Sequence, residues 1–520
     1  MDRILIFCLI FLFSNITFGQ APDFNVEFSN SFGGSAEEDF FSGFATKDGG
    51  YLLTGLTFST DGDIDSASVY DDADIFVVKC NSLGVKEWAK TFGGNRYDKA
   101  RYVIEDKDLN IVVVGGTHSY DGDIDSTHGN SEVFVLKLDP FGNKIWMKQY
   151  GGTGYESGRY ISQLSSGNFL VGGYSTSHNF DVPSNVSQHD GWLFMIDVDG
   201  NLIWSQTIGG SGTERLRGFV ELSDGGYMTY GSSTSNDFQI TGNNGGHDFW
   251  ATRTDSVGNL LWSKLYGGSG NELCYHMIET SDGNFLMAGF TTSNDGDVLG
   301  NNGGEDGWLI KIDASGNLLS QTCLGGKEKD KLSRVEEDAN GNYLTFGLAR
   351  SRDADLFGAN NTYSQEFWLA QVDSSLNFNW SYCIGGKKSE FGKELLINPI
   401  DRSIVLMGES RSVDGPVLYN HGGLDFWIVK LIECASFPSE QLDVQFWINS
   451  MEGNMIIDSP RAQIVNVYLY NLLGSEVFKK LNVQLNVGLN TIPIELNSSA
   501  FIAHVFCRNQ FMSKKCIVVK

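Results

Sequence analysis

Acidic side chains recur along this chain at intervals that suit either ligand binding or internal hydrogen bonding. A Gly-Gly pair followed by an acid occurs seven times, as in the phrases SFGGSAEE and LYGGSGNE. If the strand that begins at each acid lines a central channel, these carboxylates form a ring at one mouth and are candidate ligand-binding residues. The alternative is that each one accepts hydrogen bonds from backbone N–H groups of a neighbouring loop. The seven acids are Glu38, Asp98, Glu156, Glu214, Glu272, Asp330 and Glu390.

Two shorter runs have the pattern Asp-x-Asp-x-Asp, which suggests a calcium site. They consist of Asp61, Asp63 and Asp65, and of Asp121, Asp123 and Asp125. Calcium takes six to eight oxygen ligands, and carboxylates supply them. Neither run continues as an EF-hand loop, because Ser66 and Ser126 stand at the position of its glycine. The pattern is therefore compatible with calcium as a cofactor, with a solvated polar loop as the alternative.

Sequence signatures of catalysis are absent, since the chain contains no G-x-S-x-G, H-E-x-x-H or G-x-x-x-x-G-K pattern. The acidic loops could supply paired carboxylates for glycoside hydrolysis, but the separation that decides this chemistry is not given by sequence. Lysine-rich loops in the sixth and seventh repeats could contact an anionic ligand, with a solvated charge cluster as the alternative. These loops contain Lys327, Lys329, Lys387 and Lys388, with Arg352 nearby.

The Gly-Gly pairs mark a repeat, because their first glycines are separated by 58 or 60 residues. Each repeat contains four β-prone runs, and Gly-containing turns such as SDGN and ASGN separate them, which predicts a four-stranded antiparallel unit. Such a unit cannot bury both of its faces alone and must stack on copies of itself. The first glycines are Gly33, Gly93, Gly151, Gly209, Gly267, Gly325 and Gly385.

The chain ends distinguish a closed ring from a straight solenoid or a string of separate sandwiches. The seventh repeat stops after its third strand, FWIVKLIEC, whereas the run FNVEFSNSFGG precedes the first repeat. Within that run, Phe28 takes the position at which other repeats have tryptophan. We therefore predict an all-β fold in which residues 20–434 form a seven-bladed β-propeller. Its N-terminal strand completes blade 7 and removes the open edges.

The N-terminus is typical of a secretory signal peptide over residues 1–19. Arg3 precedes an apolar run, and small residues Thr17 and Gly19 follow it. No later stretch is long and apolar enough for a transmembrane segment. We expect an exported protein.

Charge narrows the class of partner. The whole chain has a net charge of −27, although residues 447–520 hold seven Lys and Arg against four acids. The propeller is therefore strongly acidic and repels phosphates, so we expect no nucleic-acid partner. Cations, basic proteins and neutral sugars remain candidates.

The tail reads as a second small unit. After a linker over residues 435–446, residues 447–520 contain alternating apolar runs that suit a small Ig-like β-sandwich. Pro460, the turn from Leu473 to Val477, Gly488 and the ending KCIVVK resemble the type A C-terminal sorting domain of the type IX secretion system of Bacteroidetes. Ala503 and His504 depart from that family's Gly-x-Tyr stretch. The resemblance implies export to the periplasm, passage through the type IX secretion machinery, and release or attachment at the outer-membrane surface.

The repeats, with phrases such as GGSGNELCYHMIETSDGNFLMAGF, resemble bacterial β-propeller repeats of the SBBP type. That resemblance implies a fold and no activity. We expect a secreted or cell-surface propeller that binds a protein or glycan ligand through its acidic long-loop face without catalysis. An extracellular carbohydrate-active hydrolase or lyase and a structural surface protein are the alternatives.

Overall fold

The structure is a computed structural model in which the chain forms two compact units, one consisting mainly of Val26–Ile432 and the other mainly of Glu433–Lys520. The predicted signal peptide, Asp65 and most of the predicted linker lie outside the described residues. The described residues are 21–64, 72–125, 127–183, 185, 189–356, 364–398, 402–433, 445–449, 454–459, 463–471, 476–493, 500–507 and 510–517.

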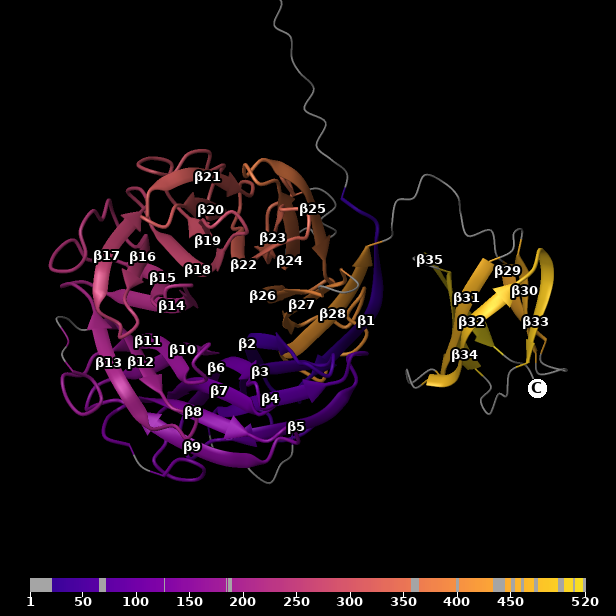
Figure 1. The fold of residues 1–520 in the computed structure, drawn as a ribbon, viewed down its shortest axis with the longest axis horizontal. Helices are drawn as coiled ribbons and strands as arrows, with labels where there is room; N and C mark the ends of the chain where they lie inside the picture. Colours follow the sequence, from indigo (N-terminus) through magenta and orange to yellow (C-terminus); the bar gives the residue numbers. More distant parts are fainter. Residues whose placement is uncertain are drawn as a thin grey trace, which may run out of the picture. The chain divides into compact units, whose positions relative to one another are not determined.

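The first unit consists of seven four-stranded antiparallel sheets around an axis, so the predicted seven-bladed propeller is confirmed (Figure 1). The inner strands are β2 (Glu38–Ala45), β6 (Asp98–Glu105), β10 (Glu156–Gln163), β14 (Glu214–Glu221), β18 (Glu272–Glu279), β22 (Lys331–Glu337) and β26 (Glu390–Ile397). The second strands are β3 (Tyr51–Thr57), β7 (Ile111–Thr117), β11 (Phe169–Ser175), β15 (Tyr227–Ser233), β19 (Phe285–Thr291), β23 (Tyr343–Ala349) and β27 (Ile404–Ser410). The third strands are β4 (Asp74–Cys80), β8 (Glu132–Leu138), β12 (Asp190–Ile196), β16 (Asp248–Thr254), β20 (Asp306–Ile312), β24 (Glu366–Val372) and β28 (Asp425–Glu433). The outer strands are β5 (Lys86–Phe92), β9 (Lys144–Tyr150), β13 (Leu202–Ile208), β17 (Leu260–Tyr266), β21 (Leu318–Leu324), β25 (Phe378–Ile384) and, in blade 7, β1 (Phe24–Phe32).

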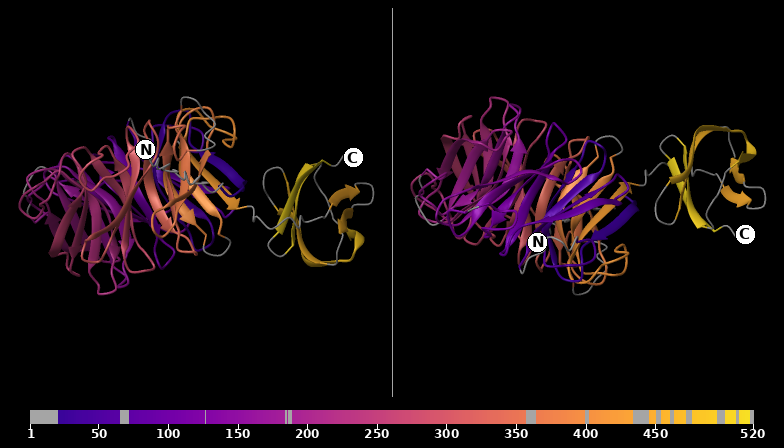
Figure 2. Two further views of the ribbon diagram at one scale, coloured as in Figure 1. Left: turned by 90° about the horizontal axis from the view of Figure 1, so that it is seen from above. Right: turned by 90° about the horizontal axis from the view of Figure 1, so that it is seen from below.

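The core lies between the blades. Every residue of β4, β8, β12 and β20 is buried, because these third strands are covered on both faces by neighbouring sheets. The largest fully buried side chains include one tryptophan from the third strand of each of five blades: Trp192, Trp250, Trp308, Trp368 and Trp427. The strands run between the two faces of the disc, where the connections lie (Figure 2).

The N-terminal strand β1 closes the ring by pairing with β28, as the sequence predicted. Trp427 of β28 donates from Nε1 to the Ser29 hydroxyl of β1 at 2.9 Å. Within blades 3 and 4, Trp192 and Trp250 make the same bond to Ser205 and Ser263 of their own outer strands, at 2.8 and 2.9 Å. Ser29 therefore occupies the position of an ordinary fourth-strand residue, although it lies 398 residues from its partner.

The second unit contains two sheets. One is three-stranded, with β29 (Gln445–Asn449), β30 (Asn454–Ser459) and β33 (Gly488–Pro493) in that order. The other is four-stranded, in the order β32 (Glu476–Leu485), β31 (Gln463–Asn471), β34 (Ala500–Cys507) and β35 (Gln510–Ile517). The Ig-like sandwich and the sorting role stay predictions. Across the described residues of both units, no helix is long and apolar enough to cross a membrane.

Closure of the ring makes a testable prediction about Ser29. Its hydroxyl accepts from Trp427 and donates to the Pro416 carbonyl at 2.6 Å, so Ser29→Val deprives the buried Trp427 N–H and the half-buried Pro416 carbonyl of this partner. We expect the substitution to lower the free energy of unfolding in urea by about 1–3 kcal/mol. The control is Val26→Thr, at a side chain of the same strand that is 42% exposed, which should change it by less than about 0.5 kcal/mol. Equal effects of the two substitutions would contradict this account of closure.

Candidate functional site

The seven acids that begin or immediately precede the inner strands are buried, with 0–1% of each side chain exposed. Each accepts a hydrogen bond from the N–H of the second glycine of its own Gly-Gly pair, as Glu38 does from Gly34 and Glu272 from Gly268, both at 2.9 Å. In six blades a Ser or Thr hydroxyl at the end of the second strand donates to the other oxygen. These hydroxyls belong to Thr57, Thr117, Ser175, Ser233, Thr291 and Ser410. The acids thus fasten each connection to its own blade and present no surface.

The aspartates of the long loops hold the same connections from outside. Asp61 accepts from the Ser35 N–H at 2.7 Å, and Asp121 accepts from the Asn95 N–H at 2.8 Å. Two residues later in each run, Asp63 and Asp123 accept from the first glycine of the pair, Gly33 and Gly93, at 3.1 and 3.3 Å. These last two carboxylates also form ion pairs with Lys86 and Lys144.

Calcium at these runs stays a prediction. Asp125 is exposed and Asp65 lies outside the described residues. Among the side chains that the structure describes, no group of three or more His, Cys, Asp or Glu is placed to hold a metal ion.

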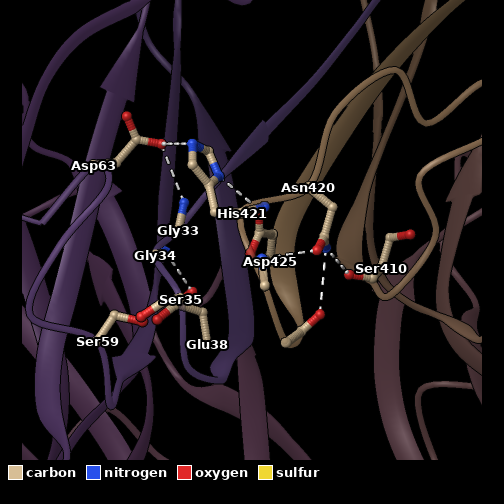
Figure 3. A network of polar contacts seen from close by, with 12 residues as sticks. Gly33, Gly34, Ser35, Glu38, Ser59, Asp63, Ser410, Asn420, His421 and Asp425 are labelled. Atoms are coloured by element: carbon tan, nitrogen blue, oxygen red, sulfur yellow. Dashed lines mark hydrogen bonds and ion pairs between the residues drawn. The ribbon is translucent and has the colours of Figure 1, made fainter.

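Figure 3 shows the connection where blades 7 and 1 meet. His421, in the loop before β28, lies with Nδ1 2.7 Å from Asp425 and with Nε2 3.7 Å from Asp63 of blade 1. Asp63 in turn accepts from Gly33. The Gly-Gly connection is therefore held by polar groups of both adjacent blades.

The first glycine of each pair is required because carboxylates from two blades converge on it. A Cβ atom on Gly267 would lie 2.5 Å from an oxygen of Asp248, which begins the third strand of blade 4. It would also lie 2.5 Å from an oxygen of Glu272, which begins the inner strand of blade 5. Gly33 stands in the same way between Glu38 and Asp425. This convergence explains why the glycine pair and the acid repeat together.

The buried acids next to the first glycines have raised pKa values. Burial, together with the charge of Glu272, raises the pKa of Asp248 to about 7. Burial and the charge of Asp330 do the same to Asp306, also to about 7. The protein therefore holds protons at these junctions that an unfolded chain would release.

The glycine can be tested directly. Gly267→Ala places a methyl group against two carboxylates and should lower the free energy of unfolding by about 1–3 kcal/mol. The matched control is Gly116→Ala, where a Cβ would have its nearest neighbour at 3.4 Å, and which should be tolerated. Equal urea midpoints for the two variants would contradict the convergence of carboxylates.

The raised pKa values predict a pH dependence of stability. A group whose folded pKa is about 7 and whose unfolded pKa is 3.8 stabilises the fold fully below 3.8. That contribution is lost as pH rises through 7. The free energy of unfolding should therefore be higher at about pH 5.5 than at about pH 8, by roughly 1 kcal/mol or more per group. Asp306→Asn should reduce this difference, whereas Asp199→Asn, in an exposed turn, should leave it unchanged.

Every inner strand carries a β-bulge at the same place. Where β6 pairs with β7, Ala100 lies opposite Gly115 and Tyr102 opposite Val114, so Arg101 has no partner residue in the ladder. Bulges re-aim side chains and are over-represented beside active sites. The seven bulged residues are Phe41, Arg101, Arg159, Arg217, Tyr275, Ser333 and Lys393.

Three consecutive blades bring five positive charges together at the bulges and two residues before them. These residues, which we call the cation cluster, are Lys99, Arg101, Arg159, Arg215 and Arg217. Arg215 is exposed and the other four are half-buried. Since the inner strands of successive blades contact one another around the ring, the cluster lies beside the propeller axis (Figure 1).

The charges of the cluster oppose one another. Burial and the charges of Arg101 and Arg159 lower the pKa of Lys99 to about 8. Burial and the neighbouring guanidinium groups lower the pKa of Arg101, Arg159 and Arg217 to about 10. Such repulsion costs stability unless a negative group compensates it.

No carboxylate of the described residues forms an ion pair with the cluster, although the charge of Asp39 in β2 counteracts the lowering of the pKa of Lys99 and Arg101. By contrast, two other inner-strand lysines are paired, Lys331 with Glu305 at 2.8 Å and Lys393 with Glu409 at 3.5 Å. The cluster instead rests on aromatic rings: Arg101 lies 4.1 Å from the ring centre of Phe41, and Arg217 lies 5.1 Å from that of Tyr275. Aromatic faces attract cations without neutralising them. An anionic ligand is the chemical complement of this site.

The lysine-rich loops that the sequence singled out are different. Lys327 pairs with Asp353 at 3.2 Å, Lys329 with Glu305 at 3.2 Å, and Lys387 with Asp414 at 3.3 Å. Each of these three lysines lies beside a carboxylate, and Lys327 is 82% exposed at its side chain.

The cation cluster was not among the predicted site residues, although a sequence pattern for it exists. The phrases DKAR, ESGR and ERLR begin three consecutive inner strands, each with a cation three residues after the buried acid. Nothing in the sequence marks the bulge that aligns these cations.

Comparison with known proteins assigns no family: no protein-family model matches the chain, and neither does any curated protein. Among solved structures, it is similar to an ulvan lyase, a polysaccharide lyase bound to -[GlcA(1-4)Rha3S]-, at a TM-score of 0.45 and 10% identity, covering 76% of this chain and 95% of that one. It is also similar to a puromycin hydrolase (TM-score 0.41, 11% identity, 88% and 61% covered). A third is a DUF4221-family protein of Bacteroides vulgatus (TM-score 0.33, 11% identity, 79% and 99% covered). Likenesses of this extent assign no activity to the chain.

Proposed function

We propose that this protein is a non-catalytic binding protein whose propeller holds an anionic ligand at the cation cluster. The observation that carries the proposal is the set of five adjacent positive charges with no carboxylate partner in the described part of the chain. Three of the five are arginines at bulged positions of consecutive blades. Arginine presents a planar set of donors that matches carboxylate, sulfate and phosphate groups in two-point contacts.

The long-loop face is the side from which a ligand reaches the cluster. The inner strands begin at the Gly-Gly connections on that face. The cluster occupies positions one and three residues after the buried acids that follow these connections. The proposal therefore keeps the face that the sequence predicted and replaces its acidic ring by the cation cluster as the contact surface. The seven buried acids contribute by fixing the start of each inner strand.

We also propose that the protein is secreted, because sequence features near both ends of the chain support export. The signal-like segment over residues 1–19 and the resemblance of the tail to a type IX sorting domain support export, followed by release or attachment at the outer-membrane surface. On this proposal the tail serves export, and the propeller binds the ligand outside the cell.

Sulfate is the simplest probe of the proposed function. In a buffer free of multivalent anions, titration calorimetry with sodium sulfate should give saturable binding. Arg159→Gln should weaken it at least about tenfold, because a hydrogen bond to a charged group contributes about 1.5–3 kcal/mol. The control is Lys327→Gln, which changes the net charge equally but removes an exposed, already paired lysine.

Equal weakening by the two substitutions, or no saturable binding to the unaltered protein, would contradict the proposal. Binding should also decline with added sodium chloride, since salt screens the cluster. Release of reducing ends from an acidic polysaccharide by the same protein, and its loss in Arg159→Gln, would favour the carbohydrate-active alternative over pure binding.

A further inference from the structure

A layer of side chains closes the propeller axis directly beyond the cation cluster. Arg334 of β22 lies 5.8 Å from the ring centre of Tyr102 on β6. These strands belong to blades 6 and 2, which are not neighbours in a ring of seven, so the contact crosses the axis. Tyr102 in turn lies 4.4 Å from Tyr160 of blade 3, ring centre to ring centre.

Hydrogen bonds between blades hold the layer. Arg334 donates to both oxygens of Glu394 on β26, at 2.5 and 2.8 Å, and Ser42 of blade 1 donates to the same carboxylate at 3.2 Å. Arg334 and Glu394 are 8% and 4% exposed. Each member follows a bulged residue by one position, so the layer lies just deeper than the bulges as seen from the long-loop face. The site is therefore closed at its base.

Aromatic side chains stand at both ends of the arginine series. Along blades 1 to 5 the bulged residues are, in order, Phe41, Arg101, Arg159, Arg217 and Tyr275. Both aromatic residues are half-buried, and each lies beside the arginine next to it. Aromatic rings pack against apolar faces, while the arginines between them bind negative groups. A sugar ring with a carboxylate or sulfate substituent has both features.

The rim of the site disfavours a long polyanion lying across the face. Exposed loop acids such as Asp61 and Asp295 surround the connections outside the cluster. A negatively charged chain spread over this rim would be repelled, whereas a single charged end can enter the positive centre.

We propose that the ligand is the terminal acidic residue of a saccharide, bound end-on against the closed layer. This inference rests on the proposed function and adds the ligand class and the direction of binding. The arginines of blades 2 to 4 bind the anionic group, and Phe41 and Tyr275 contact the sugar ring. The layer of Tyr102, Tyr160, Arg334 and Glu394 stops the chain from passing through the propeller.

The test uses the full-length protein and four probes: sodium sulfate, galacturonate oligomers of increasing length, neutral cello-oligosaccharides and hexaglutamate. Galacturonate oligomers should bind at least about tenfold more tightly than sulfate. Their affinity per chain should stay constant within about threefold as length increases, because only one end is bound. The neutral oligosaccharides should not bind. Hexaglutamate should bind more weakly than the galacturonate oligomers.

Variants separate the two parts of the inference. Because the Tyr275 ring also supports Arg217, Tyr275→Leu is judged by a ratio: it should weaken galacturonate binding at least about tenfold more than it weakens sulfate binding, whereas Arg159→Gln should weaken both to a similar extent. Because the length series uses the unaltered protein, it decides the binding direction even if Tyr275→Leu fails to fold.

Affinity per chain that rises steadily with length would overturn end-on binding. Sulfate binding without galacturonate binding, or tighter binding of hexaglutamate, would overturn the saccharide class and leave the proposed function standing. Failure of every anion to bind would overturn the proposed function itself.

Discussion

This propeller depends on its Gly-Gly connections, each of which lies between carboxylates from two blades. The first glycine lies between an acid of the preceding blade and an acid of its own blade, and a side chain there would collide with both. The second glycine donates its N–H to the latter acid. Each junction thus fixes the angle between neighbouring sheets and the point at which the next inner strand begins. With the same junction seven times, and β1 paired to β28, the ring closes with four strands in every blade.

This frame tolerates a cation cluster beside the axis that lowers the stability of the fold. Five cations lie close together without an ion-paired carboxylate, and burial together with their mutual repulsion lowers the pKa values of Lys99, Arg101, Arg159 and Arg217. The hydrogen-bonded Gly-Gly connections and the buried third strands supply the stability that offsets this repulsion. The sevenfold symmetry is broken here, since blades 2 to 4 carry the cations, whereas blades 6 and 7 supply the ion pair between Arg334 and Glu394 to the layer that closes the axis. An acidic protein therefore presents a positive centre.

Much of the fold was predictable because it follows from the regular spacing of residues along the chain. The glycines from Gly33 to Gly385 gave the blade count, and Phe28 at a tryptophan position indicated ring closure. The recurrence of Glu38 and its counterparts was visible too, and hydrogen bonding to a neighbouring loop was one of two interpretations. Burial favours the hydrogen-bonding interpretation, because a side chain with no exposed surface contacts only its own protein. The sandwich, the sorting role and calcium stay predictions.

The cation cluster lay beyond sequence reasoning because its members are distant in sequence and meet only when three inner strands stand side by side. The residues of DKAR, ESGR and ERLR are 58 residues apart from one repeat to the next, and each is unremarkable alone. Sequence by itself determined the repeated blade, its strand order and the closure of the ring, since these follow from local periodicity and turn residues. Only the tertiary structure decided which charges are paired and which are not. Charge compensation depends on distances between blades, and no spacing along the chain contains those distances.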